Sequence, residues 1–150
     1  MKKIFVIYGH YNNKSFTCAI KDTFIESAKQ NGHEIDLADL YQDKFNPVFA
    51  GEKANEEIKS YQSRIEKADV IVFIYPIWWF RAPAIVEGFI DRVFTPPWAF
   101  KFKKVIGYYG YPVGKLKNKR AIIFNVYGSP RFATVLFFLN LPIRRFKRGF

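Results

Sequence analysis

The chain has 150 residues, a formal net charge of +11 and a single cysteine, Cys18. This length fits one domain, residues 1–150, with a sizeable core. One cysteine excludes an internal disulfide, and the start MKKIFVIYGH lacks the apolar run of a signal peptide, so we expect a cytoplasmic protein. The apolar stretch from Phe132 to Ile143 is shorter than the ~20 residues of a spanning helix, so we expect no membrane span.

The charge is unevenly distributed. Residues 1–91 carry 11 basic and 13 acidic side chains, whereas the residues after Asp91 include 13 basic and no acidic ones. This pattern fits a basic surface at residues 101–120 and 144–148, or a chain that lacks an acidic segment present in longer related proteins. We favour the second interpretation and expect no nucleic-acid partner, because no RNA-recognition signature, zinc-ligand cluster or helix-turn-helix pattern accompanies the charge.

The first part of the chain predicts a β-α-β unit. Residues 3–8 form an apolar run of strand length, and Ser15 is placed to cap a helix that ends at residues 31–32. Apolar positions of this helix recur every four residues, at Phe16, Ile20, Phe24 and Ala28. Residues 34–40 alternate in polarity and predict a second strand.

The rest of the chain continues this alternation. We expect an irregular connection at 41–51, a helix at 52–68, a buried strand at 70–75 and a helix opened by Pro83. A basic loop at 101–119 and a fourth strand at 120–128 complete the prediction. Alternating strands and helices predict an α/β fold with a doubly wound parallel sheet. Such sheets often have five strands, so the fifth is apparently missing.

An aromatic loop follows the strand at 70–75. Trp78, Trp79 and Phe80 stand between Pro76 and Pro83, and the two prolines restrict the backbone on both sides. Ligands bind at the carboxyl ends of strands in open α/β sheets, and a rigid aromatic ledge suits a flat ligand. Core filling is the alternative for any single ring, although three consecutive side chains cannot all point inward.

The loop from Gly9 to Thr17 lacks both the dinucleotide and the P-loop glycine patterns. Its backbone N–H groups, hydroxyls, the Lys14 cation and the start of a helix nevertheless suit a phosphate, with ordinary helix capping as the alternative for Ser15. His10 has no partner at metal-ligand spacing, so we expect no metal site. The chain also shows no nucleophile, base and orienter set, so we expect a cofactor to supply the chemistry.

Three segments resemble the NAD(P)H quinone oxidoreductases with a flavodoxin-like fold. YPIWWFRAPAIVEGFIDRVF is similar to their flavin-site segment, YGHYNNKSFTCA to their first loop, and DLADLYQDKFNPV to their Asp-Leu-Tyr and Phe-x-Pro segment. The resemblance covers essentially the whole chain. It implies a flavin that carries hydride from NAD(P)H to a quinone or similar acceptor. We prefer FMN to FAD, because the chain is compact and shows no obvious adenosine pocket.

The resemblance also assigns residues. It implies contacts with the flavin phosphate and ribityl chain for His10, Lys14, Ser15, Phe16 and Thr17. It implies contacts along the flavin ring for Pro76, Ile77, Trp78, Trp79 and Phe80. The third loop, with Tyr127 and Gly128, would lie near the pyrimidine edge. The acceptor would be lined by Phe80, and by Phe100 and Phe102 from the partner subunit of a homodimer.

Two departures from the family pattern affect these expectations. The segment SPRFATVLFF after Gly128 has neither the Tyr nor the His that assists hydride transfer in the best-known members, so no catalytic residue is predicted. The segment LPIRRFKRGF resembles a helix that leads into a final strand and helix, so we expect an unpaired strand edge. The alternatives to the oxidoreductase are a flavodoxin-like binding module with little activity, or a basic nucleic-acid or membrane-surface binder.

Overall fold

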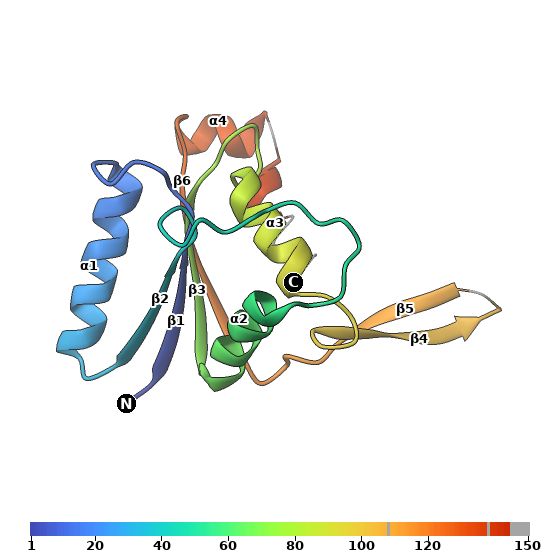
Figure 1. Cartoon of the computed structure of the whole chain (residues 1–150). Coiled ribbons are helices and arrows are strands. Elements are labelled where there is room, and N and C mark those ends of the chain that lie inside the picture. Colours follow the sequence, from blue (N-terminus) through green and yellow to red (C-terminus); the bar gives the residue numbers. More distant parts are fainter. Residues whose placement is uncertain (108, 138, 145–150) are drawn as a thin grey trace.

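The computed structural model describes residues 1–107, 109–137 and 139–144 (Figure 1). Its helices are α1 (Phe16–Gln30), α2 (Glu56–Lys67), α3 (Ala84–Val93) and α4 (Arg131–Leu136). Its strands are β1 (Lys3–Tyr8), β2 (Glu34–Asp39), β3 (Val70–Pro76), β4 (Phe100–Ile106), β5 (Tyr109–Gly114) and β6 (Arg120–Val126).

Four of the strands form the predicted parallel sheet, in the order β2-β1-β3-β6. This is the order of the first four strands in a flavodoxin-like sheet, in which the chain winds outward in both directions from β1. The doubly wound α/β prediction is therefore confirmed. Because all four strands run the same way, the loops after β1, β3 and β6 meet at one edge of the sheet.

Both faces of the sheet are covered by helices (Figure 1). Successive side chains of a strand point to opposite faces. Val6 and Tyr8 of β1 accordingly pack in a cluster with α1, whereas Phe5 and Ile7 pack in the larger core with α2 and α3. Cys18 of α1 lies in the first cluster and is buried.

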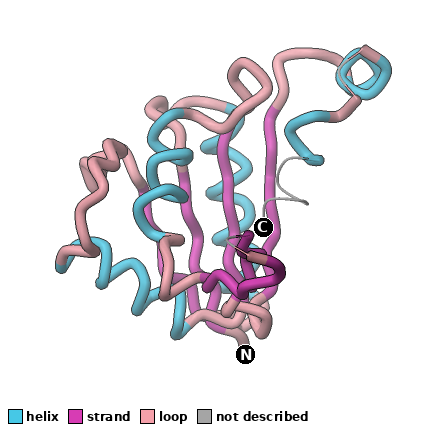
Figure 2. Tube along the Cα trace, turned by 90° about the vertical axis from the view of Figure 1, so that its right-hand side faces the viewer, coloured by secondary structure: helices cyan, strands magenta, loops and turns pink. Residues whose placement is uncertain are grey.

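Strand β6 lies at an edge of the sheet (Figure 2). Within the described residues it pairs with β3 alone, and its Ile122 side chain is 42% exposed. An unpaired strand edge with partly uncovered apolar side chains can receive a further strand.

Residues 101–119 do not form the predicted basic loop. Strands β4 and β5 pair antiparallel in a hairpin that projects from the body of the domain (Figure 1). Phe100 and Phe102 alternate with Lys101 and Lys103, which is the two-residue period of a strand. The glycines and lysines of this region concealed that period.

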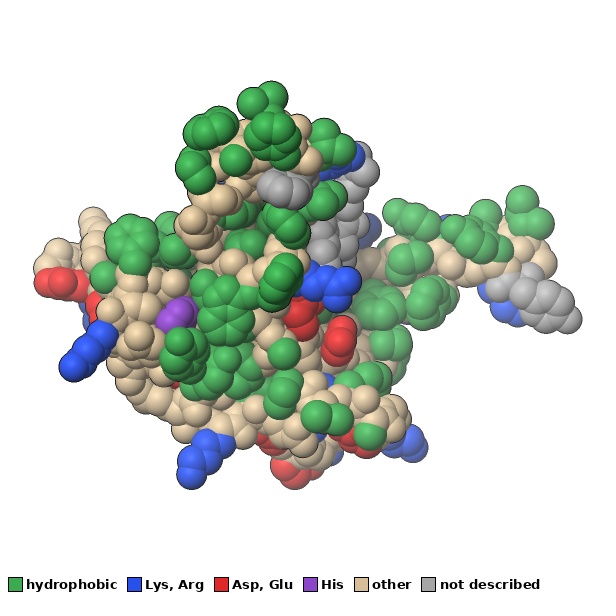
Figure 3. All heavy atoms as spheres, turned by 90° about the horizontal axis from the view of Figure 1, so that it is seen from above, with side chains coloured by type: hydrophobic (Ala, Val, Ile, Leu, Met, Phe, Trp, Pro, Cys, Tyr) green, Lys and Arg blue, Asp and Glu red, His purple; other side chains and the backbone are tan. Residues whose placement is uncertain are grey.

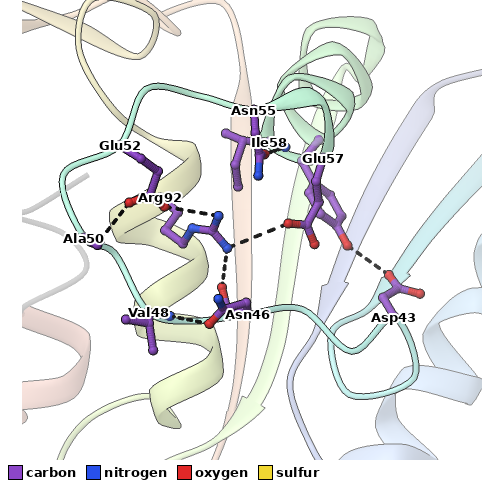
Figure 4. Close-up of polar contacts among 10 residues, drawn as sticks. Asp43, Asn46, Val48, Ala50, Glu52, Asn55, Glu57, Ile58 and Arg92 are labelled. Atoms are coloured by element: carbon purple, nitrogen blue, oxygen red, sulfur yellow. Dashed lines mark hydrogen bonds and ion pairs between the residues drawn. The ribbon is translucent and has the colours of Figure 1, made fainter.

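Helix α2 begins at Glu56, four residues later than predicted. The Asn55 side chain caps it by accepting a hydrogen bond from the Ile58 N–H at 3.0 Å. Glu52 instead lies in the preceding loop, where it contacts the buried guanidinium of Arg92 at 3.3 Å (Figure 4). Arg92 also contacts Glu57 and donates a hydrogen bond to the Asn46 carbonyl, so this network fastens the loop to α3.

Helix α4 was not predicted from the sequence. Together with the residues that follow, it exposes large apolar side chains, including Phe132, Leu136 and Phe137. Of the helices in the described part of the chain, none has the length and apolar character needed to cross a membrane. The predicted basic segment at 144–148 lies almost wholly outside the described residues, which end at Arg144.

Candidate functional site

The loops after β1, β3 and β6 converge at the carboxyl edge of the sheet, which is the face seen from above in Figure 3. Gly9 donates a backbone hydrogen bond to the Ile74 carbonyl at 3.0 Å, and Ile77 donates one to the Val126 carbonyl at 2.8 Å. These bonds hold the three loops in fixed positions relative to one another. The predicted site residues of the three loops therefore lie at one edge of the sheet.

Gly9 allows the first loop to approach α3 closely. A Cβ atom at this position would lie 2.1 Å from Cγ2 of Val86, which is far inside van der Waals contact. A side chain at this point would therefore force Val86 or the loop to move. This close approach places His10 beside the aromatic loop after β3.

The first loop uses several of its own backbone donors. The Asn12 N–H donates to Nδ1 of His10 at 2.9 Å, and the Asn12 side chain and carbonyl accept hydrogen bonds from the N–H groups of Lys14 and Ser15. Fewer N–H groups of this loop are therefore available to a ligand than the sequence predicted. The same hydrogen bonds hold the loop in place. Because Nδ1 of His10 is already bonded, Nε2 is the ring nitrogen that can contact a ligand.

Ser15 caps α1 by accepting a hydrogen bond from the Cys18 N–H at 3.1 Å, as predicted. Phe16 and Thr17 contribute the first helical N–H groups, which have no partner in the preceding turn of a helix. The two side chains differ, because Thr17 is 2% exposed whereas Phe16 is 71% exposed. The predicted apolar stripe of α1 is therefore wrong at Phe16. Lys14 is exposed beside this helix start, where an anion would be stabilised.

The aromatic loop after β3 is a tight turn. Trp78 and Arg81 exchange two backbone hydrogen bonds of 2.9 Å, and the two residues between them, Trp79 and Phe80, have φ angles of 50° and 63°. Two positive φ angles in a two-residue turn are usually found with Asn and Gly, and they cost other residues about 1–2 kcal/mol each. Trp79 is 92% exposed and so does not fill the core.

The third loop begins with two polar groups that lack partners. The Tyr127 hydroxyl and Oδ1 of Asn125 are both buried without a hydrogen-bond partner. Burial raises the pKa of Tyr127 above its ordinary value, and the neighbouring Asn125 side chain offsets part of this rise. Unpartnered buried polar atoms are costly in a folded protein, and their position at the end of β6 suits the polar edge of a ligand. Gly128 follows and is exposed, with open space around its Cα.

Two residues at this edge were missed in the sequence analysis. Tyr11 stacks on His10 with ring centroids 5.0 Å apart and lies 6.1 Å from Trp78. Tyr41, just after β2, lies 6.2 Å from Tyr11. Burial raises the pKa of Tyr41, and the nearby Tyr11 adds to this effect. The sequence did contain a signal for both residues, because each is a tyrosine that lies within three residues of the end of a strand, in the segments GHY and DLY.

Phe100 and Phe102 lie on the β4–β5 hairpin rather than beside the three loops of their own chain (Figure 1). Their rings contact each other with centroids 5.5 Å apart, and Phe102 is 63% exposed. They line a cavity of about 1680 Å³ with Trp98, Pro96 and Pro97. Trp98 packs against the core and donates a hydrogen bond to Glu66.

The donor set at this edge fits a flavin. A helix start with Ser15 and Lys14 suits a phosphate, the turn at Trp79 offers an aromatic surface, and the orphaned atoms at Asn125 and Tyr127 suit a ring edge that carries polar atoms. Within the described residues, no group of three His, Cys, Asp or Glu side chains could hold a metal ion.

Comparison with known proteins identifies the family. A family model described as flavodoxin-like fold matches residues 2–140. An uncharacterised NAD(P)H oxidoreductase from Haemophilus influenzae is 35% identical over 133 residues, which cover 83% of this chain. The chain belongs to the flavodoxin-like NAD(P)H quinone oxidoreductase family. The family and fold expected from the sequence are thus confirmed.

Other relatives carry more specific names. NAD(P)H dehydrogenase [quinone] 1 from Cavia porcellus is 26% identical over 82% of the chain. The chain spans 63% of the length of the Haemophilus protein and 52% of that of the Cavia protein. Among solved structures, Smu.1420 from Streptococcus mutans is 34% identical, with a TM-score of 0.75 over 88% of this chain and 71% of its own. An FMN-dependent NADH-azoreductase from Bacillus anthracis, solved with FMN, shares the fold, with 19% identity, a TM-score of 0.70 and coverage of 95% and 76%.

Proposed function

We propose that this chain is a flavin-dependent NAD(P)H oxidoreductase whose acceptor is a quinone or a similar compound. The observation that carries the proposal is the meeting of three different features at one sheet edge: the capped helix start at Ser15, the exposed aromatic turn at Trp79, and the unpartnered polar atoms at Asn125 and Tyr127. The names of the Haemophilus and Cavia relatives support the same chemistry.

The residues of the site would bind and orient the cofactor. Lys14, Ser15 and the first N–H groups of α1 would hold its phosphate, with Nε2 of His10 as a further donor. Residues 76–80 would lie along the ring, and Tyr127 would donate to a ring oxygen or nitrogen. When bound, a flavin supplies the two-electron chemistry that the side chains themselves cannot perform.

FMN is the flavin we propose, on two grounds. The FMN-bound azoreductase shares the fold, and the helix start of α1 provides one anion site for a single terminal phosphate. We also propose a cytoplasmic location, because Cys18 is free and buried. A homodimer, in which Phe100 and Phe102 reach the partner's acceptor pocket, completes the proposal.

The cofactor is tested by titrating the purified chain with FMN and with riboflavin, which lacks the phosphate. We expect FMN to bind at least tenfold more tightly, because the phosphate meets the helix start and Lys14. Lys14→Gln should weaken the binding of FMN and leave the affinity for riboflavin unchanged, so that the two affinities become more similar. A chain that binds neither flavin would refute the proposal.

A further inference from the structure

Helix α4 and the residues after it carry an exposed apolar surface. Its large side chains are Phe132, Val135, Leu136, Phe137, Leu139 and Leu141, all of them exposed. Hydrophobic side chains gather over α4 in Figure 3, and α4 lies beyond the edge strand β6 in Figure 2. Single apolar residues are common on protein surfaces, whereas a continuous group of this kind indicates an interaction site.

The orientation of α4 is fixed by its polar side. Thr134 is buried, and its hydroxyl lies 3.1 Å from that of Ser129 in the third loop. The Thr134 carbonyl accepts a hydrogen bond from the Asn140 N–H at 3.0 Å, which ties the following residues to the helix. A surface helix usually buries its apolar side and exposes its polar side. Helix α4 is held with these two sides reversed, so its apolar side chains face outward.

The charge of this part of the chain is entirely positive. Residues 131–150 include Arg131, Arg144, Arg145, Lys147 and Arg148 and no acidic residue, and Arg144 is exposed. Apolar side chains that are accompanied by basic ones are typical of segments that lie on anionic lipid surfaces. The apolar groups enter the boundary between headgroups and acyl chains, and the cations attract the lipid phosphates and carboxylates.

Two other arrangements fit this segment less well. Pairing of the surface with the same surface of a second copy would bring like charges together, because neither side contributes a carboxylate. A membrane-spanning role is also disfavoured, because no helix among the described residues has the length and apolar character to cross a bilayer. The combination of charge and short helix length therefore favours contact with one face of a bilayer.

We propose that α4 and the residues up to 143 dock on the surface of an anionic lipid bilayer. The apolar side chains enter the bilayer surface, and the positive charge of residues 131–150 provides the preference for anionic lipids. Docking needs no flavin and is therefore independent of the proposed function. Because α4 begins three residues after Gly128, docking also brings the third loop close to the bilayer.

The first experiment measures flotation of the chain with lipid vesicles, since aggregated protein does not float. We expect binding to phosphatidylcholine vesicles that contain about one-third phosphatidylserine, and little binding to phosphatidylcholine alone. Leu136→Asp should lower the partition coefficient by about tenfold or more. Val48→Asp is the matched control, because Val48 is similarly exposed, at 65% against 71%, and lies in the loop after β2. Circular dichroism checks that each variant is folded.

The second experiment tests the contribution of charge. Arg144→Gln should weaken binding to the anionic vesicles by about fivefold, and Lys29→Gln, which removes an exposed cation of α1, should not. Raising the salt concentration from about 0.1 M to about 0.5 M should also weaken binding, because it screens the attraction.

Three results would overturn the inference. The parent chain could fail to float with anionic vesicles, it could bind neutral vesicles equally well, or Leu136→Asp could bind as tightly as Val48→Asp. A parent that ignores vesicles, together with a Leu136→Asp variant that is monomeric where the parent is dimeric, would assign the apolar surface to a second copy instead. Binding of anionic vesicles by a chain that takes up no flavin would refute the proposed function and support this inference.

Discussion

Trp78 and Arg81 are joined by two backbone hydrogen bonds of 2.9 Å, and this pairing holds Trp79 at the tip of a tight turn with its side chain 92% exposed. The positive φ angle of Trp79 costs free energy that no burial of its own ring offsets. Strain at an exposed aromatic residue is typical of a functional position. We therefore propose that this ring contacts the ligand, since it contributes no buried surface to the fold.

Replacement of Trp79 separates these two roles. Trp79→Ala keeps the strained backbone and removes the ring, so flavin affinity should fall by about 1–3 kcal/mol with little change in stability. Trp79→Gly removes both the ring and the backbone strain. It should therefore lose the same amount of flavin affinity, whereas its free energy of unfolding should rise by about 1 kcal/mol. Flavin titration and urea unfolding check both. Unchanged flavin affinity in the two variants would remove Trp79 from the site.

Gly9 offers a test of the contact that positions the first loop. Gly9→Ala places a Cβ atom against Val86, and overpacking of this kind costs about 1–3 kcal/mol in the free energy of unfolding. The matched control is Gly128→Ala, where no atom lies within 4 Å of the added Cβ. Urea unfolding should show a loss of stability for Gly9→Ala and none for Gly128→Ala. Equal stability of the two variants would mean that α3 and the first loop are not in close contact.

The sheet was predictable because its signals are local. The apolar runs at residues 3–8 and 70–75 have the length and composition of buried parallel strands, and each is followed by a loop that ends in a helix. The handedness of β-α-β connections then decides which face of the sheet each helix covers. The Trp78 to Phe80 loop was predicted to lie at the carboxyl edge by the same reasoning.

The hairpin and the contact between Tyr11 and Tyr41 were not predictable in the same way. Pairing of β4 with β5 depends on contacts between strands, and the glycines at 107, 110 and 114 looked like loop residues in the sequence. Tyr11 and Tyr41 are 30 positions apart, so only the register of β1 with β2 brings them together. Arg92 looked like one more basic residue, although its burial depends on the loop that contributes Glu52.

The loop at Glu52 should weaken in acid. Hydrogen bonds from the N–H groups of Glu52 itself and of Ala50 lower the pKa of the Glu52 carboxyl below its ordinary 4.5, and Arg92 lowers it further. A lowered pKa in the folded state gives stability that is present above the unfolded value and is lost as the pH falls through the folded value.

Glu52→Gln tests this linkage. The variant should be less stable than the parent at pH 7, and the difference should shrink as the pH falls below 4.5. Urea midpoints measured across this range check the prediction. Glu26→Gln is the control, because Glu26 accepts one hydrogen bond from Gln30 on an exposed helix face. A stability difference that does not depend on pH would contradict the role of the Glu52 charge.

Homodimerisation is tested at the hairpin. Strands β4 and β5 expose Phe102, Ile106, Tyr109 and Tyr111, and exposed apolar clusters mark interfaces. We expect light scattering to give twice the chain mass, and Phe102→Glu to shift the population towards monomer. The matched variant Lys103→Glu changes charge at the neighbouring position and should leave the dimer largely intact. A parent chain that remains monomeric at high concentration would refute the prediction.

The most direct test of the central claim is an anaerobic visible spectrum of the FMN-loaded chain during addition of NADH or NADPH. The account predicts an oxidised flavin spectrum that bleaches on addition of the nicotinamide nucleotide and returns when a quinone is added. The convergence of the three loops motivates this result. A bound flavin that keeps its oxidised spectrum with both nucleotides would contradict the proposed oxidoreductase.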